Sequence, residues 1–139
     1  MTSEARQHVD EAIALLDVAE RAMKDPVHPG GAAAPVAFLA GVTAAAAMLG
    51  TSFSPVDAGR RLDELINLAV ASGPDGMEVV ADLAILRAAR TRHLTDLQLV
   101  DGDTAATLLE AARRLVDVAI RCTGPAERPA GPVDDVEPG

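Results

Sequence analysis

The sequence predicts an all-α fold, an antiparallel bundle of four to five helices with a disordered C-terminal tail. Apolar residues recur at three- and four-residue steps in most segments, which is the spacing of one face of a helix. The chain is 49% hydrophobic, yet its aromatic residues are Phe38 and Phe53 alone. Alanine and short aliphatic side chains must therefore fill the core, and alanine favours helices over strands.

The length and the end of the chain define the expected domains. A chain of 139 residues suits one domain, and we expect a helical bundle domain over residues 1–122. In residues 123–139, proline and glycine alternate with acidic residues, so no apolar face can form. Such a segment cannot bury enough apolar surface to fold, and we expect a disordered Pro/acidic tail there.

The first helix is expected over residues 3–24, where acidic residues fill the side opposite an apolar face. That face consists of Val9, Ala12, Ile13, Leu16, Ala19, Ala22 and Met23. The loop that follows, residues 25–31, contains two prolines and two glycines, which break helices.

The second helix is expected over residues 34–49, at the centre of the bundle. No charged residue occurs between Asp25 and Asp57, and a helix that is apolar on all sides is typically buried. Pro35 is expected in its first turn and Gly50 at its C-terminal cap. The apolar run is nearly as long as the roughly 20 residues that cross a bilayer. It lacks flanking basic clusters and aromatic belts, so we interpret it as a buried helix and expect no membrane span.

The third helix is expected to begin near Ser54, a residue type favoured at the N-cap, with Pro55 at the first helical position. It should end at the Gly73-Pro74 break. Its expected apolar face consists of Leu62, Leu65, Ile66 and Ala69.

The fourth helix is expected from Asp75 to about Leu94. Asp75 and Glu78 have the spacing of a capping box, in which two side chains satisfy free backbone N–H groups at a helix start. The expected apolar set consists of Val79, Val80, Leu83, Ala84 and Leu86.

The fifth helix is expected over residues 104–121, capped by Asp103, and it has the most regular amphipathic pattern of the chain. In the connector before it, apolar residues alternate at Leu97 and Leu99, which is typical of a short extended piece. The expected apolar face consists of Ala105, Leu108, Leu109, Ala112, Leu115, Val116, Ala119 and Ile120.

The charge and the cysteine content restrict the class of protein. A net charge of −9 argues against a general nucleic-acid coat or a protein drawn to anionic membranes, although it leaves room for one basic patch. Cys122 is the single cysteine, so no intramolecular disulfide can form. Residues 1–10 lack the basic-then-apolar order of a signal peptide. We therefore expect a cytoplasmic location.

The strongest local motif is the basic end of the fourth helix, where Arg87, Arg90, Arg92 and His93 occur with no acidic residue among them. One interpretation is structural, because cations favour a helix C-terminus and a charged face is solvated. The other is a phosphate-binding or RNA-binding site, in which Arg87, Arg90 and Arg92 hold phosphate and His93 is available for proton transfer.

At this motif the chain resembles a known family. The segment 86–120, an arginine-containing helix, a connector and a capped amphipathic helix, resembles the C-terminal half of the HEPN bundle (higher eukaryotes and prokaryotes nucleotide-binding). Many HEPN proteins are dimers that cut RNA without metal, and their motif is Arg, four to six residues, then His. Arg87, five residues, then His93 fits that spacing. Arg90-Thr91 is closer to the family's Arg-polar start, but the histidine would then stand near position 95, which is threonine.

The resemblance implies catalytic roles for three residues. His93 would move a proton at the ribose 2′-hydroxyl or the leaving oxygen. Arg87 or Arg90 would stabilise charge on the phosphate. Two copies would meet across a symmetric dimer interface.

Other chemistry finds little support in the sequence. No P-loop, dinucleotide fingerprint or zinc spacing occurs, so no cofactor is expected. Glu4 and His8 share a helix face, but two ligands do not make a metal site. The lack of aromatic residues also removes platforms on which bases stack.

Two functions from different classes remain after this. The first is a non-catalytic helical interaction or accessory protein, acting as a homodimer or binding a protein partner, in the manner of a degenerate HEPN-like protein. The alternative is a metal-independent HEPN-type ribonuclease acting on RNA. A small-molecule pocket inside the bundle is a third option, and it would be lined by Ala, Leu and Met.

Overall fold

The computed structural model describes residues 3–24, 29–51, 57, 60–93 and 101–123. Within these ranges it contains five helices and no strand, which confirms the predicted all-α bundle. The tail expected from residue 123 falls almost wholly on residues 124–139, outside the described part of the chain. The helices are α1 (Ser3–Ala22), α2 (Pro29–Leu49), α4 (Leu62–Ala71), α5 (Pro74–His93) and α6 (Gly102–Thr123).

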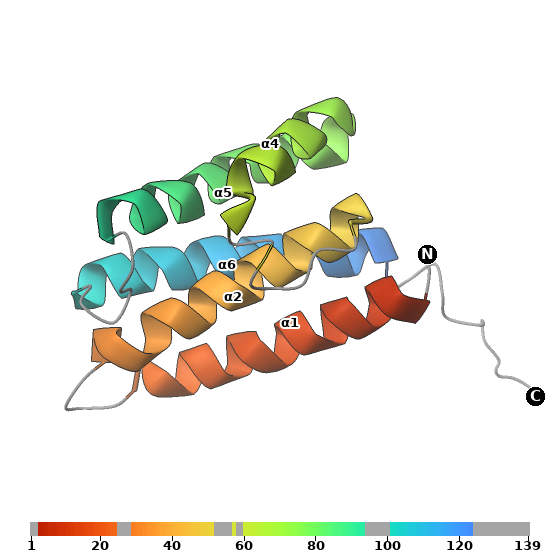
Figure 1. Ribbon diagram of the computed structural model, residues 1–139. Helices are drawn as coiled ribbons and strands as arrows, with labels where there is room; N and C mark the ends of the chain where they lie inside the picture. The colour runs from red at the N-terminus through yellow and green to blue at the C-terminus, as the bar shows by residue number, and fades with distance from the viewer. Residues whose placement is uncertain (1–2, 25–28, 52–56, 58–59, 94–100, 124–139) are drawn as a thin grey trace, which may run out of the picture.

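Helix α2 lies at the centre of the bundle, as predicted. It packs most extensively against α6 and α1, and Figure 1 shows it between α1 and the α4–α5 pair. Because its side chains are so short, neighbouring helices come close to its backbone. A Cβ atom added at Gly41 would lie 2.8 Å from Leu86 Cδ1 and 3.2 Å from Leu115 Cδ1. The buried residues of α2 include Ala33, Ala34, Ala37, Phe38, Ala40, Val42, Ala44, Ala45, Ala46 and Ala47.

The membrane alternative for this helix finds no support. Among the described residues, no helix combines the length and the apolar character needed to cross a bilayer. The uninterrupted apolar surface of α2 is explained instead by burial on all sides within the bundle.

The predicted start of α2 was wrong, whereas its predicted C-cap is confirmed. The helix begins at Pro29, so Pro35 is inside the helix and not in its first turn, and the predicted start was wrong. Helix α2 includes Gly30 and Gly31 because the alanines that follow them favour a helix. Pro35 is tolerated inside the helix, although it has no N–H to donate. The predicted C-cap is confirmed: Gly50 has φ of +74°, and its N–H donates to the carbonyl of Ala47 at 3.2 Å. The N–H of Thr51 donates to Ala46 at 3.0 Å, which completes a Schellman motif.

Helices α1 and α6 enclose α2 with the faces that their periodicity predicted. Seven residues of the predicted α6 face are buried and Ile120 is half-buried. On α1, Val9, Ala12 and Ala19 are buried, but Ile13 is exposed, which corrects its assignment to the core. It stands at the edge of the apolar stripe, where the neighbouring helices do not cover it.

The start of α6 also differs from the prediction. The backbone N–H of Thr104 donates to Oδ1 of Asp101 at 2.8 Å, so Asp101 and not Asp103 caps the helix. Both residues are acidic and both precede the apolar pattern, so periodicity alone does not choose between them. The extended piece predicted around Leu97 and Leu99 lies outside the described residues.

Helices α4 and α5 form a tight hairpin on one side of the bundle (Figure 1). The chain turns at Gly73, whose φ of +85° suits glycine. A Cβ at Gly76 would lie 2.0 Å from the carbonyl oxygen of Ala69, so the two helices touch at their backbones there. The predicted start at Ser54 lies outside the described residues, and α4 begins at Leu62, preceded by Arg61.

Two predictions for α5 were wrong. Ala84 is exposed and not part of the core. The capping box predicted at its start is wrong, because α5 begins at Pro74 and Asp75 therefore lies inside the first turn and not at the N-cap. Glu78 accepts a hydrogen bond from Nη2 of Arg121 on α6 at 2.5 Å. This ion pair joins α5 to α6, and the sequence analysis did not predict it.

Candidate functional site

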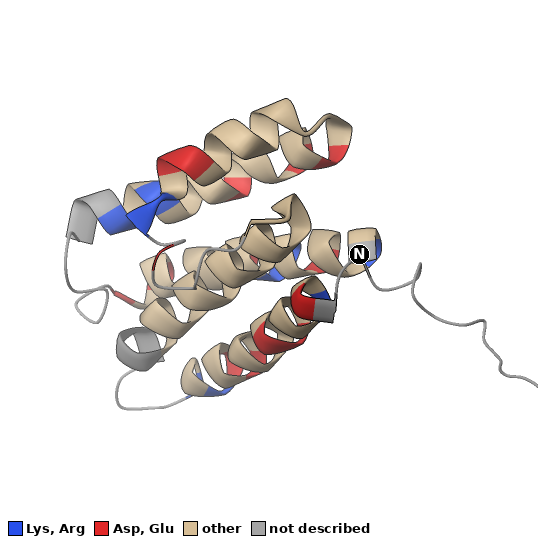
Figure 2. Ribbon diagram, turned by 45° about the vertical axis from the view of Figure 1, so that its right-hand side comes forward, with Lys and Arg blue, Asp and Glu red and all other residues tan. Residues whose placement is uncertain are grey.

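The basic cluster is carried by the last two turns of α5. Helix α5 continues to His93, so Arg87, Arg90, Arg92 and His93 all lie on one helix, as predicted. Figure 2 shows basic residues near this end of α5, close to acidic residues of α4. The local sequence favours this helix because alanine and leucine separate the charged residues.

Arg87 is held by an acidic residue of the neighbouring helix. Its Nη1 lies 2.7 Å from Oδ1 of Asp63 on α4, and it donates a hydrogen bond to that oxygen. Both side chains are exposed, so the ion pair is solvated and contributes little to stability. Its effect on the site is larger, because a carboxylate beside Arg87 lowers the attraction of this guanidinium for phosphate.

Arg90 points to a different part of the bundle. Its guanidinium carbon lies 5.7 Å from the ring centroid of Phe38, a buried residue of α2. This is the distance of a cation–π contact. Arg90 thus covers the edge of the core, while Arg87 reaches toward α4, and the two side chains do not converge on one point.

Arg92 and His93 are placed only through their backbones. Their side chains fall outside the part of the molecule that the structure describes. The helix fixes the register: the Cα atoms of Arg87 and His93 are about 9 Å apart along the axis and about 120° apart around it. Because the His93 side chain is not described, the pairing of arginine and histidine predicted for catalysis stays a prediction.

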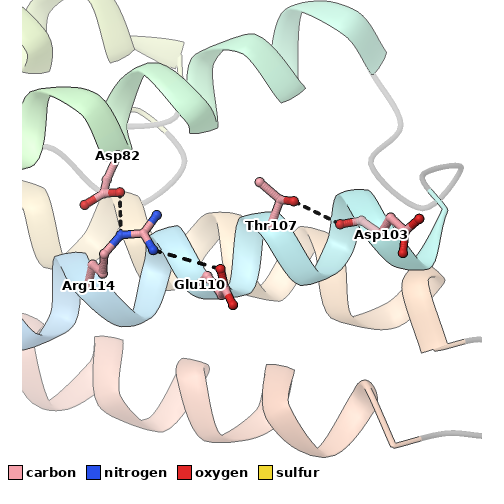
Figure 3. Close-up of polar contacts among 5 residues, drawn as sticks. All are labelled: Asp82, Asp103, Thr107, Glu110 and Arg114. Carbon is pink, nitrogen blue, oxygen red and sulfur yellow. Dashed lines mark hydrogen bonds and ion pairs between the residues drawn. The ribbon is translucent and has the colours of Figure 1, made fainter.

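A partly buried ion pair between α5 and α6 was missed by sequence reasoning. Nε of Arg114 donates to Oδ1 of Asp82 at 2.8 Å (Figure 3). The Asp82 side chain is 9% exposed, whereas that of Arg114 is 51% exposed. Arg114 also approaches Glu110 on its own helix, with Nη1 4.0 Å from Oε1. The sequence does contain a signal for this ion pair: Asp82 is a single carboxylate on the side of α5 that carries the apolar residues Val79 and Leu86.

Beside this ion pair, a groove opens between α5 and α6. It has a volume of about 180 Å³ and is lined by Ile85, Ala88, Ala89, Thr104, Thr107 and Leu108. Its lining is mainly apolar, and the hydroxyl of Thr107 is already occupied as a donor to the carbonyl of Asp103 at 3.0 Å (Figure 3). The groove has no charged side chain in its wall, so it suits an apolar group better than a phosphate.

The far end of the α5–α6 interface holds Cys122, next to Arg121. Burial raises the pKa of the Cys122 thiol, the carboxylate of Asp75 raises it further, and Arg121 opposes them. A raised pKa lowers the thiolate fraction at neutral pH, and the thiolate is the reactive form. This cysteine is therefore poorly suited to act as a nucleophile.

Metal chemistry has no centre in the described part of the chain. No three His, Cys, Asp or Glu side chains come together there in a way that would hold an ion. Glu4 and His8, which share a face of α1, gain no third ligand among these residues.

Comparisons with known proteins identified no similar protein. No protein-family model, curated protein or solved structure matches this chain.

Proposed function

We propose that this chain is a non-catalytic helical interaction module, which acts in the cytoplasm as a homodimer or by binding a protein partner. The observation that carries the proposal is the divergence of the two described arginines of the basic cluster. Arg87 donates to Asp63 on α4, and Arg90 lies over Phe38 on α2. Phosphate recognition needs guanidinium groups that converge with free donors.

Exposed apolar side chains favour an interaction module. Val70 and Met77, near the α4–α5 turn, are 52% and 54% exposed. Exposed large apolar side chains are one feature of interaction surfaces. The lone cysteine fits a reducing cytoplasm.

The alternative is a metal-independent ribonuclease of the HEPN type. It is favoured by the presence of Arg87 and His93 on one continuous helix with the family's spacing. In that function His93 would transfer the proton and Arg87 or Arg90 would stabilise the phosphate charge. The ion pair between Arg87 and Asp63 counts against it, because the carboxylate competes with phosphate for this guanidinium.

An RNA cleavage assay separates the two functions. The full chain is incubated with single-stranded and hairpin RNA in the presence of EDTA, and the products are resolved on a gel. We expect no cleavage above that of a His93→Ala variant. Cleavage that is abolished by His93→Ala and by Arg87→Ala, but kept by Arg113→Ala on the opposite side of the bundle, would establish the ribonuclease and overturn the proposal.

A further inference from the structure

The helices of the bundle pack against one another to unequal extents. Helix α2 packs far more extensively against α1 and α6 than against α4 or α5. Within the described ranges, α1 contacts α2 and α6 but neither helix of the α4–α5 hairpin. Figure 1 shows the hairpin on the side of α2 that is away from α1. Helices α1, α2 and α6 therefore form a three-helix core, and the hairpin is attached to one side of it.

The two helices of the hairpin are held firmly to each other. Near the turn, a Cβ added at Gly76 of α5 would lie 2.0 Å from the carbonyl oxygen of Ala69 of α4, so the two backbones touch. Near the other end, Nη1 of Arg87 on α5 donates to Oδ1 of Asp63 on α4 at 2.7 Å. Because both ends of the hairpin are joined in this way, α4 and α5 can move together.

The first half of α5 is attached to α6 along its edge by ion pairs. Glu78 and Asp82 of α5 pair with Arg121 and Arg114 of α6, and Nη2 of Arg121 also lies 3.9 Å from Oδ1 of Asp75. The side chains of both arginines are about half exposed. Water replaces the partner of a half-exposed charge readily, so such contacts hold two helices together only weakly.

The second half of α5 is separated from α6 by the groove of about 180 Å³. Protein interiors rarely contain voids larger than a water molecule, and the atoms that line such a gap lose their dispersion contacts across it. The apolar attachment of α5 is therefore concentrated in three large buried side chains, Val79, Leu83 and Leu86. The hairpin is thus tight within itself and loosely attached to the core.

We propose that the α4–α5 hairpin opens from the core of α1, α2 and α6 as one unit while that core stays folded. The inference goes beyond the proposed function and does not depend on it. Cooperative local opening commonly follows the boundaries of supersecondary units such as a helical hairpin. Leu86 lies directly against Gly41, where an added Cβ would stand 2.8 Å from Leu86 Cδ1. Opening of the hairpin therefore uncovers the face of α2 around Gly41, and it changes the surface that the protein presents.

Native-state hydrogen exchange of the full chain, read by mass spectrometry at low urea concentrations, tests the opening. After correction for intrinsic rates, we expect the protected amides of α4 and α5 to share one opening equilibrium. They should exchange at least about tenfold faster than the slowest amides of α1 and α2. Equal protection of the hairpin and the core would overturn the inference, as would separate opening equilibria for α4 and α5.

Val9→Ala weakens the core without touching the hairpin. Val9 is a buried residue of α1, a helix that does not contact α4 or α5 in the described part of the chain. Loss of two buried methyl groups should speed exchange in α1 and α2 about tenfold. Exchange in the hairpin should change by less than about twofold, because its opening leaves the contacts of Val9 intact. Equal acceleration of hairpin and core would show that the hairpin opens only when the whole bundle unfolds, and would refute the inference.

Arg114→Ala acts on the attachment itself. It leaves the nearly buried Asp82 carboxylate without its donor while the hairpin is closed, and the carboxylate regains water when the hairpin opens. We expect exchange in α4 and α5 to become at least about fivefold faster. The matched control is Arg113→Ala on the same helix, which removes an ion pair to Glu20 of α1 and should leave hairpin exchange unchanged. Equal hairpin exchange in the two variants would contradict the proposed attachment, and circular dichroism verifies that each variant is folded.

Discussion

Arg114 places its Nε 2.8 Å from Oδ1 of Asp82, and this contact joins α6 to α5 beside the apolar groove. Asp82 is nearly buried, whereas the guanidinium of Arg114 remains half in solvent. The ion pair described for the Asp82 carboxylate is with this arginine, whereas the arginine also approaches Glu110 at 4.0 Å. Loss of the two residues should have different consequences.

Replacement of Arg114 should be costly. Arg114→Ala leaves the Asp82 carboxylate without its hydrogen-bond donor in a nearly buried position, and we expect a loss of about 1–3 kcal/mol in the free energy of unfolding. Urea denaturation followed by circular dichroism measures this. The control is Arg113→Ala on the same helix, whose partner Glu20 is far more exposed than Asp82. An exposed pair should cost less than about 1 kcal/mol, so equal losses in the two variants would contradict the prediction.

Gly76→Ala should destabilise the α4–α5 hairpin. The new Cβ would lie 2.0 Å from the Ala69 carbonyl oxygen, a backbone atom that can move only with its helix. We expect a loss of at least about 3 kcal/mol despite the higher helix propensity of alanine. Gly102→Ala is the matched control, because a Cβ there meets no atom within 4 Å. That variant should change stability by less than about 1 kcal/mol, and a similar melting point for both would refute the steric argument.

The thiol of Cys122 should react slowly at neutral pH. Burial and Asp75 raise its pKa, so the rate of reaction with an aromatic disulfide reagent should rise only at a pH above the usual thiol value of about 8.5. Asp75→Asn removes one cause of the shift and should move the pH–rate profile to lower pH. Cys122→Ser, which removes the single thiol, gives the background rate.

The same pKa has a consequence for stability. Because the folded-state pKa is raised, the protonated thiol contributes its full stabilisation below the usual thiol pKa. That contribution is lost as the pH rises through the folded-state value. Thermal melts of the wild type and Cys122→Ser should therefore diverge with alkaline pH, the wild type losing more. Parallel pH dependence of the two proteins would contradict this.

Arg90 should stabilise the bundle through Phe38. Arg90→Ala should lower the free energy of unfolding by about 0.5–1 kcal/mol, the range of an exposed cation–π contact. A double-mutant cycle with Phe38→Leu isolates the contact from the burial of the ring. A coupling energy indistinguishable from zero would show that Arg90 is not engaged with the ring in solution, and that its guanidinium is available to other ligands.

The faces of the helices could be predicted where the apolar period is strict. The α6 face was assigned correctly because Leu108, Leu115 and their neighbours repeat once per turn, and this period records burial directly. Ala84 and Ile13 were misplaced because each stands at the edge of a stripe. Whether an edge residue is covered depends on the angle at which the next helix crosses, and the sequence of one helix does not contain that angle.

Contacts between helices could not be predicted. Glu78 was assigned to a capping box, and its partner is Arg121, which is 43 residues away in the chain. Arg87 was assigned to a basic cluster, and its partner is Asp63 on α4. Periodicity places a side chain on one side of its own helix, but the identity of the facing residue depends on the packing of the whole bundle. The sequence therefore showed which residues make up the candidate site. It did not show that Arg87 and Arg90 point to different partners.

The central position of α2 affects how the chain emerges from the ribosome. Much of the surface that covers α2 belongs to α6, which is synthesised after the other helices that the structure describes. Until that helix appears, the nascent polypeptide displays an uncharged, alanine-rich segment that attracts other unfolded chains and the chaperones that bind them. Productive folding must wait for α6, so a premature stop before Gly102 would yield an aggregating fragment instead of a smaller domain.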